Sequence, residues 1–108
     1  EQTFATAASD LFSEGKMYYL SGNYDDAEQS LNDCLDLITD EDYTGEVIYY
    51  LGKIAEGRGE TATAISYYQR VIDEYPESSQ AANAKNSIDT LNASVASAQE
   101  QTQAQTNE

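Results

Sequence analysis

Apolar residues recur along the chain at spacings of three and four, which is the periodicity of a helix that buries one face. This pattern predicts five helices, at about residues 3–20, 24–38, 46–57, 61–75 and 79–95. β-Branched residues never alternate with polar residues over a sustained run, so no strand is predicted. The fold class expected from the apolar pattern is therefore all-α.

Turn-forming residues separate the predicted helices. The expected breaks are the turn 21–23, the acidic loop 39–45, the turn 57–59 and Pro76. Gly22 supplies the left-handed backbone that ends a helix, and Asn23 is a suitable N-cap for the next one. Pro76 cannot continue a helix, and Ser78 or Ser79 is expected to cap the last helix.

The sequence also repeats itself at a constant interval of 37 residues. Five residues recur identically: Gly15, Lys16, Gly22, Ala27 and Asp36 correspond to Gly52, Lys53, Gly59, Ala64 and Asp73. Large apolar or aromatic sites keep the same interval, as Leu31 and Tyr68 do. A repeat of this length indicates one supersecondary unit that stacks on its neighbours to bury its apolar face.

The spacing inside each unit resembles the tetratricopeptide repeat, a pair of antiparallel helices with small residues where they cross. The first unit reads Gly15-x2-Tyr18 and Gly22-x-Tyr24-x2-Ala27-x3-Leu31. The second reads Gly52-x2-Ala55 and Gly59-x-Thr61-x2-Ala64-x3-Tyr68, and it closes with Pro76. The family repeat has about 34 residues, so the additional residues of this chain, about 42–44, are expected in the loop between the units.

The resemblance implies two tetratricopeptide-like helical hairpins plus a C-terminal capping helix, as a fragment of a right-handed α-solenoid. The predicted units span about residues 8–41 and 45–78, and the capping helix spans 79–95, so that residues 1–95 form one helical domain. The polar sequence at residues 96–108 offers nothing large to bury, and it is predicted to be a frayed or disordered tail.

The stretch at residues 64–78 has a further likeness. Its sequence AISYYQRVIDEYPES resembles repeats of bacterial cell-envelope assembly proteins. The chain also begins with Glu1 rather than Met, from which we expect a processed protein or a domain of a longer bacterial one. Both observations favour a location outside the cytoplasm over a cytoplasmic one.

Charge narrows the class of partner. The chain has 20 acidic and 5 basic residues and a formal net charge of −15. Nucleic-acid binding needs a basic surface, and anionic membranes select the same charge, so neither ligand is expected. The acidity is interpreted as a solvated outer surface, with a basic protein partner as the alternative. Because no stretch approaches the apolar length of a membrane span, direct membrane insertion is not expected.

Groups that could perform catalysis or bind a metal are sparse. Histidine is absent and Cys34 is the only cysteine, so the sequence offers neither a disulfide nor a multi-cysteine metal cluster. Cys34 lies between Leu31 and Leu35 in an apolar helical stripe, and it is interpreted as a core residue. The acidic run at residues 40–42 lacks the alternation of a calcium loop. We therefore expect a non-enzymatic protein without cofactor or metal.

In the family that the chain resembles, the first helix of each unit lines a concave groove that binds extended peptides. Helical spacing gives the candidate contact residues on that face: Phe12, Lys16 and Tyr19, then Glu46, Tyr49, Lys53 and Glu56, and finally Asn83. Lys16 and Lys53 occupy equivalent sites and are predicted to hold a carboxylate of a peptide or protein partner. The alternative is that both lysines pair with Glu46, Glu56 or other local carboxylates.

Two functions are therefore compared. The first is a non-catalytic protein–protein interaction module that binds a peptide or protein segment in the concave groove. The second is a structural module whose terminal helices self-associate or stack on further repeats, which makes a homo-oligomer possible. A stable dimer in solution would favour assembly, and a monomer would favour the binding module.

Overall fold

Five helices make up residues 4–38 and 41–106, the part of the chain that the structure, a computed structural model, describes. In chain order they are α1 (Phe4–Ser21), α2 (Tyr24–Leu37), α3 (Glu41–Gly57), α4 (Thr61–Glu74) and α5 (Ala81–Thr106). No strand occurs within these residues. The all-α fold with helical hairpins is therefore confirmed.

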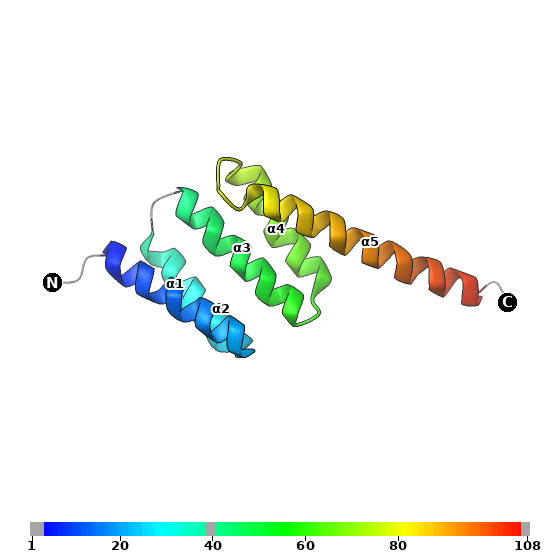
Figure 1. The fold of residues 1–108 in the computed structure, drawn as a ribbon, viewed down its shortest axis with the longest axis horizontal. Helices are drawn as coiled ribbons and strands as arrows, with labels where there is room; N and C mark the ends of the chain where they lie inside the picture. The colour runs from blue at the N-terminus through cyan, green and yellow to red at the C-terminus, as the bar shows by residue number, and fades with distance from the viewer. Residues whose placement is uncertain (1–3, 39–40, 107–108) are drawn as a thin grey trace.

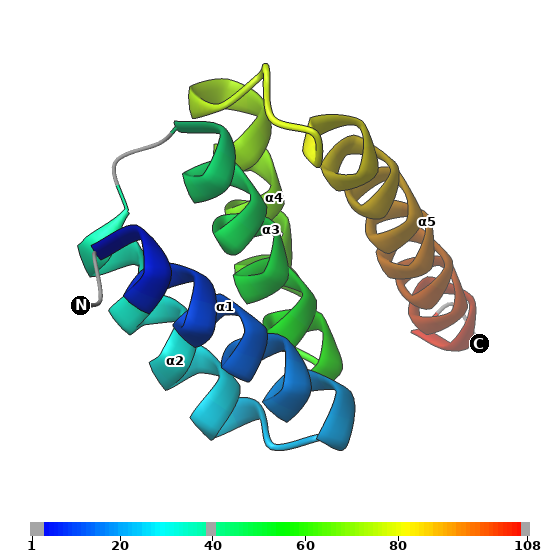
Figure 2. The same ribbon diagram turned by 60° about the vertical axis from the view of Figure 1, so that its left-hand side comes forward.

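The helices stack as two hairpins and a final helix (Figure 1). α1 packs on α2 and α3 packs on α4, while α2 also contacts α3 and thereby joins the hairpins. α5 packs against α4, and its second half extends beyond both hairpins in the two views (Figures 1 and 2). α1 and α3 lie on one side of the stack, with α2 and α4 behind them (Figure 2).

Two clusters of buried side chains form the core. The first combines residues of the α1–α2 hairpin with residues of α3: Ala8, Phe12, Ala27, Leu31, Cys34, Val47, Leu51 and Ile54. The second combines α3 with α4 and α5: Ile48, Ala55, Ala64, Tyr68, Val71, Ala84 and Ile88. Because α3 has apolar side chains on two of its edges, it contributes to both clusters and holds the hairpins together.

The repeated glycines lie where the two helices of each hairpin cross. A Cβ atom at Gly15 would lie 2.6 Å from Cδ2 of Leu31 in α2. A Cβ atom at Gly52 would lie 2.6 Å from Cε1 of Tyr68 in α4. Only a residue without a side chain permits such an approach, so the repeat interval places the same packing solution in both hairpins.

Each hairpin turn also repeats, at Gly22 and Gly59. These glycines have φ angles of 84° and 80°, in the left-handed region that they adopt at no steric cost. The N–H of Asn23 donates to the carbonyl of Tyr18 at 2.8 Å, and that of Glu60 donates to Ala55 at 2.9 Å, as in a Schellman motif. Asn23 occupies the predicted N-cap position of α2, where its carbonyl accepts the N–H of Ala27 at 2.9 Å, but its side chain makes no capping hydrogen bond.

α3 begins earlier than predicted. Residues 41–45 are helical rather than part of a loop, while residues 39 and 40 lie outside the described part of the chain. The reason is tertiary: Tyr43 continues the apolar spacing of Val47 and Tyr50, and its ring packs against Phe12 at a centroid distance of 5.3 Å. The additional residues of the interval therefore lengthen a helix instead of a loop.

α5 continues to Thr106, so the prediction of a frayed tail is wrong over residues 96–106, and residues 107 and 108 lie outside the described part. Alanine, glutamine and glutamate favour a helix, and no glycine or proline interrupts the sequence after Ala81. At the start of α5, the hydroxyl of Ser78 accepts the N–H of Gln80 at 3.2 Å. Of the two serines predicted to cap α5, Ser78 is therefore the one that accepts a backbone N–H at the start of this helix.

Candidate protein-binding face

Aromatic side chains form a connected row that is centred on α1 and α3 and ends at one ring of α2 and one ring of α4. This aromatic row consists of Phe12, Tyr19, Tyr24, Tyr43, Tyr49, Tyr50 and Tyr68. Tyr50 lies at its centre, with its ring centroid 5.5 Å from Phe12 and 5.6 Å from Tyr49, both in edge-to-face geometry. Such pairs are favourable beyond the area that they bury, so the rings hold one another in position.

Lys16 and Lys53 lie over the aromatic row. Nζ of Lys16 is 4.4 Å from the ring centroid of Phe12, and Nζ of Lys53 is 6.0 Å from that of Tyr49. A ring face attracts an ammonium group at these distances by roughly 0.5–1 kcal/mol at an exposed site. Among the side chains that the structure describes, neither lysine forms an ion pair, whereas both arginines do. Rings rather than carboxylates therefore position these two cations.

The nearby carboxylates interact with tyrosines of the aromatic row. Oε1 of Glu56 accepts a hydrogen bond from the hydroxyl of Tyr68 at 2.7 Å. Burial, and then this bond and the charge of Glu56, raise the pKa of Tyr68 well above its usual range. Burial is also the main reason that the pKa of Tyr50 is raised; the charge of Glu46 adds to the effect and that of Lys53 opposes it. The alternative prediction was that Lys16 and Lys53 pair with Glu46, Glu56 or other local carboxylates. Among the described residues no such ion pair occurs.

The eight predicted contact residues differ in exposure. Lys16, Tyr19, Glu46, Tyr49, Lys53 and Glu56 are half-buried. Phe12 is only 6% exposed, because the rings of Tyr43 and Tyr50 enclose it, so its prediction as a contact residue is wrong. Asn83 is exposed on α5, and its amide donates to Oε1 of Gln80 at 2.8 Å. No described interaction joins Asn83 to the aromatic row.

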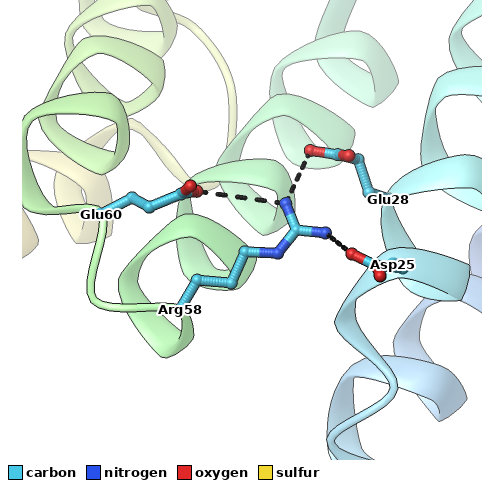
Figure 3. Close-up of polar contacts among 4 residues, drawn as sticks. All are labelled: Asp25, Glu28, Arg58 and Glu60. Carbon is cyan, nitrogen blue, oxygen red and sulfur yellow. Dashed lines mark hydrogen bonds and ion pairs between the residues drawn. The ribbon is translucent and has the colours of Figure 1, made fainter.

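Sequence reasoning gave Arg58 no role beyond its place in a turn, yet its guanidinium joins the two hairpins (Figure 3). It follows α3 and reaches back to the N-terminal part of α2, where it donates to Asp25 in the first turn and, at 3.0 Å, to Glu28 in the next turn. Glu60 lies 4.0 Å from the same guanidinium. The excess of acidic over basic residues indicated that each arginine would have carboxylates nearby. Only the fold determines that these three carboxylates lie beside Arg58.

A close contact beside Arg58 links this junction to the aromatic row. A Cβ atom at Gly57 would lie 2.6 Å from the ring of Tyr24 in α2. The Tyr24 ring in turn lies 6.0 Å from that of Tyr19. An open pocket of about 450 Å³ lies at the junction, lined by Gly22, Asn23, Tyr24, Asp25, Asp26 and Arg58. The placement of the first hairpin on the second therefore also places Tyr19 beside Tyr50.

The thiol of Cys34 lies in the core. It is fully buried and donates to the carbonyl of Ala8 at 3.2 Å, and burial raises its pKa. Within the described residues, no group of three or more acidic, cysteine or histidine side chains could hold a metal ion. No helix among them is long and apolar enough to cross a membrane.

A family model of the tetratricopeptide repeat matches residues 46–78. The match covers most of α3 and all of α4, and it ends after the proline turn. No curated protein and no solved structure matches the chain. The match supports the tetratricopeptide resemblance of the second hairpin, and the repeat interval relates the first hairpin to it. Such repeats generally act in protein–protein interaction.

Proposed function

We propose that this chain is a non-catalytic interaction module that binds a carboxylate-bearing segment of another protein on the side shared by α1 and α3. The contact residues are Lys16, Tyr19, Tyr49 and Lys53. The class of function follows from the tetratricopeptide match. The aromatic row and the two lysines that lie over it support this location on the molecule.

The single observation that carries the proposal is that Lys16 and Lys53 form no described ion pair in a chain of net charge −15. A carboxylate of a partner can approach either ammonium group without displacing an internal ion pair. Both groups keep N–H donors that a ring face does not use. Charge-assisted hydrogen bonds of this kind contribute about 1.5–3 kcal/mol each.

The tyrosines beside the lysines supply the rest of the contact. Tyr19 and Tyr49 each present part of an aromatic ring and a hydroxyl group at low cost in side-chain entropy. Ring pairs with Tyr50 fix both of them before a ligand arrives. A preorganised surface of this composition suits an extended segment with alternating apolar and acidic residues.

A selection of displayed random peptides tests the proposal. We expect the selected peptides to be enriched in Asp and Glu and to bind the wild-type chain measurably in calorimetry. Lys16→Glu and Lys53→Glu should each weaken that binding at least about tenfold, since each replaces an attraction by a repulsion. Lys85→Glu is the matched control: it makes the same change in net charge at an exposed site on α5.

Two results would contradict the proposal. If selected peptides were not acidic, the charge argument would be wrong. If Lys85→Glu weakened binding as much as Lys16→Glu did, the net charge of the chain and not the α1–α3 side would control association.

A further inference from the structure

Within the part of the chain that the structure describes, no helix packs on one edge of α1 in the way that the first hairpin packs on α3. We call this edge, which consists of Asp10, Glu14, Met17 and Leu20, the leading face. The repeat interval relates it to Val47, Leu51, Ile54 and Gly57 on α3. The equivalent face of α3 is covered by the first hairpin, so its composition indicates what kind of partner this edge of a helix binds.

On α3 the equivalent residues receive the first hairpin. Val47, Leu51 and Ile54 are 0%, 2% and 1% exposed and belong to the core cluster of the α1–α2 hairpin. Gly57 lies under the ring of Tyr24. α2 packs against α3 at this edge. In the first helix of a hairpin, such as α1 or α3, this edge is therefore a surface on which another helix can pack.

On α1 the same edge is divided into two halves. Asp10 and Glu14 replace Val47 and Leu51 and are exposed, although Oε1 of Glu14 also accepts a hydrogen bond from the hydroxyl of Ser30 in α2 at 3.3 Å. Met17 and Leu20, however, are 68% and 81% exposed, and they are the large apolar side chains that stand out as exposed in the described part of the chain. Met17 and Leu20 lie three residues apart on the same edge, and exposed apolar side chains that lie together are typical of contact surfaces.

Neither a second copy nor another hairpin of the same kind fits this face. In an antiparallel α1 pair, Met17 and Leu20 of one copy would face Asp10 and Glu14 of the other, and in a parallel pair the carboxylates would meet each other. A helix like α2 would bring further carboxylates, since its charged residues are all acidic. Leu20 also stands where only glycine leaves room for the Tyr24 ring.

We infer that the leading face binds an amphipathic helix of another protein, with apolar side chains against Met17 and Leu20 and basic side chains against Asp10 and Glu14. Methionine adapts its shape to a partner at small cost. The net charge of −15 attracts a basic partner, and the two carboxylates fix the direction in which its helix lies. This site is distinct from the α1–α3 side, because its acidic half selects the opposite charge.

A helical scaffold library with one randomised face provides the probe. Binders are selected on the wild-type chain and then measured against the double variant Met17→Ser, Leu20→Ser, whose exposed sites leave the core intact. We expect faces that combine Leu or Ile at one end with Lys or Arg at the other, and at least tenfold weaker binding to the double variant. Circular dichroism confirms that each variant keeps its helices.

A matched charge pair separates local contact from general attraction. Asp10→Lys should weaken the selected binders at least tenfold, whereas Asp36→Lys, at an exposed site on α2, should change their affinity less than threefold. Lys53→Glu should leave these binders unaffected, so this site can fail while the α1–α3 proposal stands, and the reverse also holds.

Three outcomes would overturn the inference. They are binders with acidic faces, binders that keep their affinity for the double variant, and a failure to select any binder. Sedimentation of the wild-type chain adds a fourth: a dimer that the double variant abolishes would show that a second copy occupies the leading face.

Discussion

Replacing Gly52 by alanine perturbs the point where α3 and α4 lie closest. The new Cβ atom would lie 2.6 Å from Cε1 and 2.8 Å from Cδ1 of Tyr68. Carbon atoms pack best at about 3.5–4.0 Å, so the ring would have to move by about 1 Å. Tyr68 is fully buried and its hydroxyl is bonded to Glu56 at 2.7 Å, which leaves the ring little freedom to move.

The expected loss of stability follows from two opposing effects. Overpacking a well-packed core costs about 1–3 kcal/mol. Alanine gains back about 1 kcal/mol, because it favours a helix more than glycine does. We therefore expect Gly52→Ala to lower the free energy of unfolding by up to about 2 kcal/mol. In a domain of this size each kcal/mol lowers Tm by roughly 4–8 °C.

Urea and thermal unfolding, followed by far-UV circular dichroism, measure the change. Ala82→Gly on the exposed side of α5 is the control, since it reports helix propensity alone. Gly15→Ala should cost less than Gly52→Ala, because the branched side chain of Leu31 adjusts more easily than a buried ring. If Gly52→Ala were more stable than the wild type by the full propensity gain of about 1 kcal/mol, the close crossing of α3 and α4 would be refuted.

Three further predictions concern ionisation, reactivity and the junction of the hairpins. Burial raises the pKa of Tyr50 and Tyr68 above the unfolded value of about 10. The stability that depends on their neutral form is therefore fully present below about pH 10 and is lost as the pH rises further. Thermal unfolding measured from about pH 8 to about pH 12 should show Tm falling only above about pH 10. Cys34 should react with a thiol reagent only at the rate of opening or unfolding, because it is fully buried, and equally fast reaction in the native and the unfolded protein would contradict this. Arg58→Gln should destabilise the chain more at low salt than at high salt and more than Arg70→Gln, which breaks an ion pair within α4 only; urea unfolding at two salt concentrations measures both.

Local sequence was sufficient for much of the fold. The turns at Gly22 and Gly59 need a left-handed residue, and glycine adopts that conformation without help from the rest of the molecule. The apolar periodicity assigned all five helices, since it depends only on which residues share a helix face. The repeat interval then related Gly15 to Gly52, whose packing is the same in the two hairpins.

The candidate site was only partly predictable. Helical spacing placed Lys16 and Lys53 on one side, because equivalent positions of stacked units lie on the same side. It could not distinguish a ring from a carboxylate as the neighbour of each lysine, and it assigned Phe12 to the surface although Tyr43 and Tyr50 bury it. Spacing defines the face of a helix, whereas the depth of burial depends on the helix that packs against it.

The sequence by itself thus determined the helices, their turns and the repeated crossing, because these depend on contacts close in the chain or on glycine at fixed positions. Tertiary structure decided where α3 begins, which rings hold the lysines, and that Arg58 bonds to α2. Each of these depends on side chains from different helices meeting at a short distance. No local pattern specifies such a meeting, since it exists only once the hairpins have stacked.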